Sequence, residues 1–270
     1  NVDLFYECKN DIGIRKTYHR AAEGYRNATE ISGHVLRFLH QAALQEEPAV
    51  DRVVVTVPAS FQAAQRNDTL AAARLAGIEV QNGDLLDEPV AAFIDYVIRA
   101  PESFDIGSDE TKRLLVFDFG GGTCDVAAFI LSRAKSTARV EISPLVVSRY
   151  HRLGGCDIDI AILHEELIPQ IVEQNNIDPF SLGFNDKKRF IEPSFIGIAE
   201  SLKTGLCREI SRLVKFGKYD SINKAGLIKN QPGQYSCLIA NGNEVRLRSP
   251  KLSAERFEEL LEPFLDTDLL

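Results

Sequence analysis

The sequence predicts an α/β protein in which mixed sheets are flanked by helices. A β-branched run, RVVVTVP at Arg52–Pro58, is typical of a strand buried on both faces of a parallel sheet. Apolar residues at helical spacing precede and follow this run, so helices and strands alternate along the chain. The 270 residues are enough for one or two domains with a sizeable core.

The first hundred residues should contain three helices and one further strand. Asn27 and Glu30 have the spacing of a capping box, which predicts a helix start. Gly77 follows an alanine-rich stretch and is placed as the C-terminal cap of its helix. The expected elements are a helix from Asn27 to before Pro48, a helix over Phe61–Ala76, a strand at Ile78–Val80, and a helix from Pro89 to about Arg99.

A polar joint at 100–113, APESFDIGSDETKR, divides two predicted lobes. We place the first lobe at 1–105 and the second at 106–270. Within the second lobe, 106–155 should carry a hairpin with a glycine turn, and 156–270 should form a helical subdomain with its own β-hairpin. The signals are a strand near Val140–Val147, helices from about Asp157, at about Ile191–Leu206 and after Ser253, and a type I′ turn at Asn241-Gly242.

The stretch VFDFGGGTCDV at Val116–Val126 combines a strand, three glycines, a hydroxyl and two carboxylates. Glycine permits a close backbone approach, and exposed amides can cradle phosphate oxygens. Asp118 and Asp125 would repel a phosphate unless a cation lay between them, and Mg²⁺ takes one or two carboxylates. The stretch therefore favours magnesium–nucleotide chemistry, although a tight hairpin with solvated acids is the plainer alternative.

Three further segments accompany this stretch in a fixed order. VVVTVPASFQAAQRNDTLAAARLAG and LLDEPVAAFIDY precede LLVFDFGGGTCDV, and LGGCDID follows it. Together they resemble the nucleotide-binding domain of the Hsp70 (DnaK-like) chaperone family, within the actin-like (ribonuclease H-like) ATPase fold. The resemblance is specific over 50–160, traceable to 265 and faint before residue 30. It implies two lobes around a cleft that holds ATP or ADP with Mg²⁺, in a domain that is incomplete at both ends.

The resemblance also assigns roles to individual residues. Asp118 corresponds to the acid near the metal and the attacking water, and Asp125 to the acid that holds metal-bound water. Glu88 corresponds to the acid on the opposing lobe, and it joins Asp118 and Thr123 as an expected catalytic residue. The expected nucleotide-binding residues are Gly120, Gly121, Gly122, Thr123, Gly154, Gly155, Glu200 and Lys203.

The sequence departs from the family pattern at several points. The first phosphate loop, the lysine that follows it and the late adenosine motif have no recognisable counterpart, so we expect this chain alone to hydrolyse ATP negligibly and to bind it weakly. Thr204 and Cys207 stand where the family has residues that contact adenine, which predicts loose discrimination between ATP and GTP. Pro58 and Arg66 match a relay that reports the nucleotide state.

The two acids of the glycine stretch are compatible with three functions. The first is an Hsp70-like ATPase whose complete protein couples ATP turnover to binding of client polypeptides, with co-chaperones as further partners. The second is an actin-like interaction or assembly module with little turnover, and the third is a metabolite kinase of the same fold. The segments VTVPASFQAAQR and LLDEPVAA favour the first.

Composition disfavours other classes of protein. The net charge of −8 argues against a broad nucleic-acid surface, and no apolar run approaches the roughly 18 residues of a membrane span. The five cysteines lack CxxC spacing, which indicates free thiols in a reducing compartment. We therefore expect a cytoplasmic protein without nucleic-acid or membrane partners.

Overall fold

The fold is described from a computed structural model, which defines residues 5–99, 110–133, 140–148 and 153–265. Contacts divide these residues into two compact units, and each is described by itself. The first is Glu7–Gly154, and the second is Gly155 and the residues after it together with Phe5 and Tyr6. The predicted lobe boundary at residue 105 lies outside the described residues, so the division into lobes stays a prediction.

The first unit contains two of the predicted helices with their predicted caps. Helix α1 spans Ala28–Glu46, and its N-cap Asn27 accepts a hydrogen bond from the Glu30 amide. Helix α2 spans Ala63–Leu75 and is followed by Gly77 at φ +81°, a backbone conformation that favours glycine at a helix end. Both predictions are confirmed. Such caps can be predicted from sequence because they depend on neighbouring residues only.

The parallel pair in this unit differs from the prediction. Strand β1, Val55–Val57, pairs in parallel with β2, Leu85–Asp87, and not with the predicted strand at Ile78–Val80. Ile78 and Val80 are buried beside Val55 without joining a strand. The pattern of apolar residues alone does not distinguish a buried strand from a buried segment that is not a strand. The expectation that β1 is buried on both faces is also wrong, because Thr56 is exposed.

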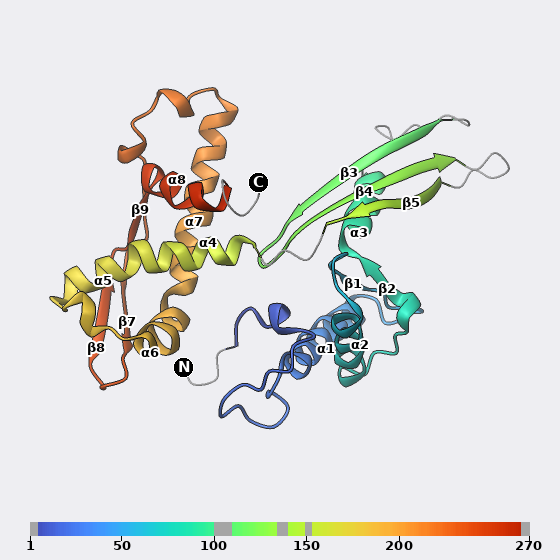
Figure 1. The fold of residues 1–270 in the computed structure, drawn as a ribbon, viewed down its shortest axis with the longest axis horizontal. Coiled ribbons are helices and arrows are strands. Elements are labelled where there is room, and N and C mark those ends of the chain that lie inside the picture. The colour runs from blue at the N-terminus through green and yellow to red at the C-terminus, as the bar shows by residue number, and fades with distance from the viewer. Residues whose placement is uncertain (1–4, 100–109, 134–139, 149–152, 266–270) are drawn as a thin grey trace. The chain divides into compact units, whose positions relative to one another are not determined.

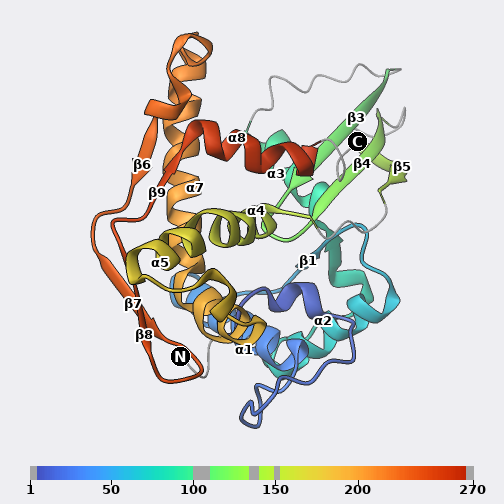
Figure 2. The ribbon, with the colours of Figure 1, turned by 60° about the vertical axis from the view of Figure 1, so that its left-hand side comes forward.

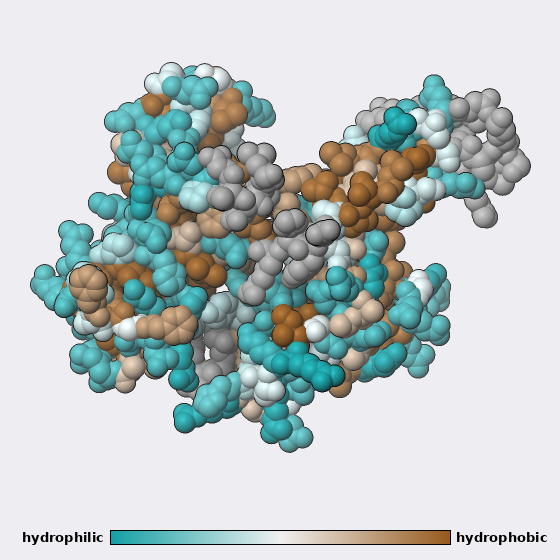
Figure 3. Space-filling model, in the orientation of Figure 1, coloured by the Kyte–Doolittle hydropathy of each residue, from teal (hydrophilic) through white to brown (hydrophobic). Residues whose placement is uncertain are grey.

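An antiparallel sheet completes the first unit. Strands β3 (Thr111–Phe119), β4 (Cys124–Arg133) and β5 (Val140–Val147) lie in that order, as the hairpin prediction requires. Helix α3, Glu88–Arg99, covers one face, where Phe93 packs with Leu131 (Figure 1). The other face of β3 is apolar and exposed, with Leu115 at 67% and Phe117 at 59%, and Figure 3 shows hydrophobic surface over this sheet.

The second unit is built around one long helix. Helix α7 spans Glu192–Lys215, nine residues beyond the predicted end at Leu206, and buries one side of its surface. Its fully or nearly buried residues include the predicted Phe195, Ile198, Leu202 and Leu206. Around it lie α4 (Gly155–Ile162), a π-helical turn (Leu163–Leu167), α5 (Ile168–Asn175), α6 (Phe184–Asp186) and a second π-helical turn (Lys187–Ile191) (Figure 2).

Short strands flank α7. Strand β6 (Ile228–Asn230) pairs with β9 (Lys251–Ser253), and β7 (Gln234–Leu238) pairs with β8 (Glu244–Arg248), both antiparallel. The β7–β8 hairpin is confirmed, but its turn is not type I′, because only Gly242 of the Asn241-Gly242 pair has positive φ. The Ile239 amide donates to Asn243 O at 2.9 Å, which encloses a three-residue loop with glycine in the left-handed position.

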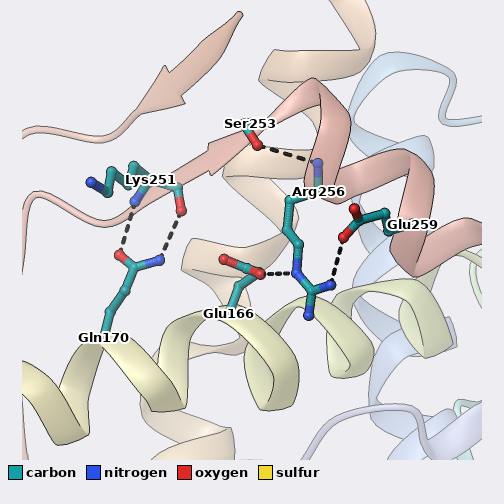
Figure 4. Close-up of polar contacts among 6 residues, drawn as sticks. All are labelled: Glu166, Gln170, Lys251, Ser253, Arg256 and Glu259. Carbon is teal, nitrogen blue, oxygen red and sulfur yellow. Dashed lines mark hydrogen bonds and ion pairs between the residues drawn. The ribbon is translucent and has the colours of Figure 1, made fainter. Parts of the chain in front are cut away.

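Polar contacts join the last helix to the rest of the second unit (Figure 4). Helix α8 spans Ala254–Pro263, and Ser253 Oγ accepts from the Arg256 amide at 3.2 Å, which confirms the predicted cap. The Arg256 guanidinium contacts Glu166 of the first π-helical turn and, at 2.7 Å, Glu259. The described residues also contain short 3-10 helices at Cys8–Asp11, Asn82–Asp84, Pro179–Ser181, Tyr219–Ser221 and Lys224–Gly226.

Candidate functional site

The turn between β3 and β4 brings the two predicted metal acids together. Asp118 and Asp125 are direct partners across the antiparallel pair, so their side chains lie on the same face of the sheet. Directly opposite residues have Cβ atoms roughly 4.5–5.5 Å apart. The Gly120 amide donates to Thr123 O at 2.9 Å and closes the turn. Two carboxylates therefore flank a loop of glycine amides and one hydroxyl.

Burial differs between the residues of this loop. Asp125 is 1% exposed and Thr123 is 6% exposed, whereas Asp118 is half-buried. Cys124, between the two buried residues, is itself buried, as expected of a small apolar side chain. Burial raises the pKa of the Cys124 thiol, and the charges of Asp125 and Asp118 raise it further, so the thiol stays neutral.

Two glycine contacts shape the backbone around the loop. A Cβ on Gly154 would lie 2.5 Å from the carbonyl carbon and oxygen of Gly121, which are backbone atoms that cannot rotate away. A Cβ on Gly122 would lie 2.5 Å from Oδ1 of Asn10, whose side chain is 6% exposed. The loop is therefore packed between Gly154 on one side and Asn10 on the other.

The predicted acid Glu88 has a basic partner that sequence analysis does not find. Glu88 is the first residue of α3, directly after β2, and its Oε1 lies 2.8 Å from Lys9 Nζ. Lys9 belongs to the 3-10 helix Cys8–Asp11, in a segment without readable periodicity and 79 residues from Glu88. Sequence analysis finds no counterpart of the lysine that follows the family's first phosphate loop. Lys9 is a candidate for that role.

A turn after β1 supplies a second residue that sequence analysis misses. Phe61 N donates to Pro58 O at 3.0 Å, and within this turn Ser60 Oγ donates to Asp125 Oδ1 at 2.6 Å. Arg66 of α2 donates to Phe61 O at 2.9 Å and to Asp87 Oδ1 at 2.6 Å. The predicted relay position Arg66 thus joins the turn to the end of β2, next to Glu88.

The remaining predicted residues lie in the second unit. Lys203 Nζ donates to Gly155 O and to Asp159 Oδ2, both at 2.7 Å, so this lysine is held inside its own unit. Glu200 is exposed on the same helix. Thr204 Oγ1 donates at 3.3 Å to the Ser201 carbonyl of its own helix. The structure therefore groups Glu88, Asp118, Asp125 and the loop in one unit, and Gly155, Glu200 and Lys203 in the other.

The donor set of the hairpin fits Mg²⁺. Asp118 and Asp125 offer hard carboxylate oxygens from adjacent positions, and Mg²⁺ uses one or two carboxylates with water and phosphate oxygens as its other ligands. Within residues 5–99, 110–133, 140–148 and 153–265, no group of three or more His, Cys, Asp or Glu side chains could form an all-protein cage. The arrangement suits a metal that is shared with a phosphate.

Asp159 leads to a prediction about pH and stability. Burial raises the pKa of its carboxyl, and the Lys203 ammonium only partly opposes this. The folded protein thus keeps a proton that the unfolded chain releases, so the free energy of unfolding falls as pH rises from the ordinary value of 3.8 through the raised pKa. We expect Asp159→Asn, which can still accept from Lys203, to lack this fall.

Urea unfolding at a series of pH values from about 4 to 7 measures this difference. Asp220→Asn, at an exposed position of the same unit, is the matched control and should follow the wild-type profile. Parallel pH profiles for wild type and Asp159→Asn would contradict the assignment.

A comparison with models of protein families adds an independent finding. A model described as Hsp70 protein matches residues 3–189, which is more than half of the chain. The matched range contains Lys9, Ser60 and Glu88 as well as the whole glycine hairpin with Gly154 and Gly155. It begins well before residue 30, where the sequence resemblance is faint, and Glu200 and Lys203 lie beyond its end. In the described part of the chain, no helix has the length and apolar character to cross a bilayer.

Proposed function

The chain belongs to the Hsp70 family, and from this premise we propose that it binds ATP and ADP with Mg²⁺. The observation that carries the proposal is the glycine loop with Asp118 and Asp125 at one register position. In the complete protein, this part would act as an ATPase that couples ATP turnover to the binding of client polypeptides. We also propose that the chain has the two-lobed fold of the actin-like ATPase domains.

Each residue has a proposed role that follows from its chemistry. The amides of the loop and the Thr123 hydroxyl would donate to phosphate oxygens, while Asp118 and Asp125 would hold Mg²⁺ directly or through water. Bound Mg²⁺ would neutralise negative charge on the phosphates. Glu88 would accept a hydrogen bond from the attacking water and orient it. The remaining nucleotide contacts would come from Gly154, Gly155, Glu200 and Lys203.

Phosphoryl transfer depends on position and charge more than on covalent catalysis. The ion pair of Lys9 with Glu88 supports the proposal, because it places one cation and one acid at the end of β2. Lys9 would donate to a phosphate oxygen, and Glu88 would be free to hold water once Lys9 had turned to the nucleotide. No disulfide joins the five cysteines, all of which lie in the described part of the chain, and this supports a reducing compartment such as the cytoplasm.

Calorimetric titration of the 270-residue chain with Mg-ATP tests the proposal. We expect weak but saturable, Mg²⁺-dependent binding, and we expect Lys9→Met to weaken it about 10- to 100-fold. A hydrogen bond to a charged group contributes about 1.5–3 kcal/mol, and roughly 1.4 kcal/mol corresponds to tenfold in affinity.

The control variant is Lys224→Met, which removes a similar ion pair, to Glu258 at 2.8 Å, on an exposed turn of the second unit. It should leave Mg-ATP binding unchanged. If the wild-type chain does not bind Mg-ATP, the proposed function is wrong. If Lys9→Met and Lys224→Met bind equally well, Lys9 has no part in the site.

A further inference from the structure

The hydrogen bond from Ser60 to Asp125 engages one oxygen of a buried carboxylate. Ser60 Oγ lies 2.6 Å from Asp125 Oδ1, and Asp125 is 1% exposed. The serine comes from the turn after β1 and the acid from β4, 65 residues apart. The other oxygen of Asp125 is not part of this hydrogen bond.

Ser60 is held in place independently of Asp125. Its turn is closed by the hydrogen bond from Phe61 N to Pro58 O. The same turn is fixed from α2, because Arg66 Nε donates to Phe61 O at 2.9 Å. The hydroxyl is therefore presented to the acid by the backbone, and it can restrict the orientation of the carboxylate.

A carboxylate with one engaged oxygen binds a cation differently from a free carboxylate. Mg²⁺ is small and octahedral, and it accepts a single carboxylate oxygen or binds through water. Ca²⁺ takes six to eight oxygen ligands and often uses both oxygens of a carboxylate. With one oxygen engaged by the Ser60 hydroxyl, Asp125 can still bind a cation through its other oxygen. Binding through both oxygens is hindered.

We propose that Ser60 is a specificity-determining residue that holds Asp125 in a one-oxygen binding mode and so favours Mg²⁺ over Ca²⁺. The inference rests on the proposed function, because it places the cation between Asp118, Asp125 and the phosphates. It adds the residue that sets the metal preference of that site.

The test compares metal affinities in wild type, Ser60→Ala and Ser60→Thr. Preformed Mg-ADP and Ca-ADP, each with the metal in excess over ADP, are titrated separately into the 270-residue chain, and the heat of binding gives the Kd of each complex. In Ser60→Ala we expect the preference for Mg²⁺ over Ca²⁺ to fall about tenfold, mainly through tighter Ca²⁺ binding by an Asp125 that is free to use both oxygens. Ser60→Thr keeps the hydroxyl and should keep the wild-type preference.

The control is Ser148→Ala. Ser148 lies just after β5, and its Oγ accepts from Val126 N of β4 at 3.0 Å, so this variant removes a hydroxyl contact that involves no carboxylate. Its metal preference should equal that of wild type. A melting curve of each variant reports whether folding is retained.

The outcomes separate the two proposals. If wild type binds Mg²⁺ and Ser60→Ala has the same metal preference, or loses affinity for both metals equally, Ser60 does not set specificity and the metal site stands. If wild type binds neither metal in the presence of ADP, the metal site itself is wrong, and the role of Ser60 is overturned with it. A shift in preference that Ser60→Thr does not share supports the inference.

Discussion

Asp118→Asn is expected to lower ATP turnover of the complete protein by about 100- to 1,000-fold, the range seen when one electrostatic contact to the transition state is removed. Asp118 lies directly opposite Asp125 at the glycine turn, where the two carboxylates would share the Mg²⁺ ion. Asparagine has the same shape, but it removes one negative charge from the proposed metal site. Steady-state phosphate release at saturating Mg-ATP measures the effect.

The fold should survive this change. In the absence of metal, two like charges opposite each other on adjacent strands are destabilising, so the melting temperature of Asp118→Asn should equal or slightly exceed that of wild type. Asp95→Asn is the matched control, because Asp95 pairs with Arg99 on the exposed side of α3. Wild-type turnover in Asp118→Asn would remove this acid from the catalytic residues.

Gly154→Ala is expected to disrupt the glycine loop, the proposed phosphate-binding element, through the backbone. The added methyl group would lie 2.5 Å from Gly121 C and O and 2.6 Å from Gly122 N, distances that force the two segments apart. Overpacking of this kind costs about 1–3 kcal/mol. We expect a lower melting temperature and at least tenfold weaker Mg-ATP binding, because the loop amides would no longer point to one position.

Gly83→Ala serves as the control for this prediction. Gly83 lies in the same unit, in the 3-10 helix Asn82–Asp84, and a Cβ there would meet no atom within 4 Å. Its melting temperature and Mg-ATP affinity should stay close to those of wild type. Equal behaviour of the two alanine variants would mean that Gly154 does not contact the loop in this way.

Several features of the fold are predictable because their causes are local. The Asn27 cap of α1, the Gly77 end of α2 and the Ser253 cap of α8 each depend on residues within one turn of the helix. The strand–glycine turn–strand order of β3 and β4 is likewise contained in one stretch of sequence. For this reason the amino-acid pattern alone is enough to place Asp118 and Asp125 together.

Other features depend on which segments pair. The short segments Ile78–Val80 and Leu85–Asp87, each with two apolar residues, follow each other closely, and only the second joins β1. Both triplets gain from burial of apolar side chains, and the choice between them is made by backbone hydrogen bonding to a strand about thirty residues away. The turn at Asn241-Gly242 shows the same limit on a smaller scale. The sequence predicts the hairpin, but it does not predict the length of its loop.

The amino-acid pattern is sufficient to predict an α/β architecture and a glycine loop between two carboxylates. Only the tertiary structure brought Lys9 to Glu88 and Ser60 to Asp125, across 79 and 65 residues. No periodicity or motif marks such pairs, because one partner of each lies in a short 3-10 helix or a turn with no regular pattern. Contacts of this kind form only when packing brings distant segments together, and they supply the cation and the hydroxyl of the proposed site.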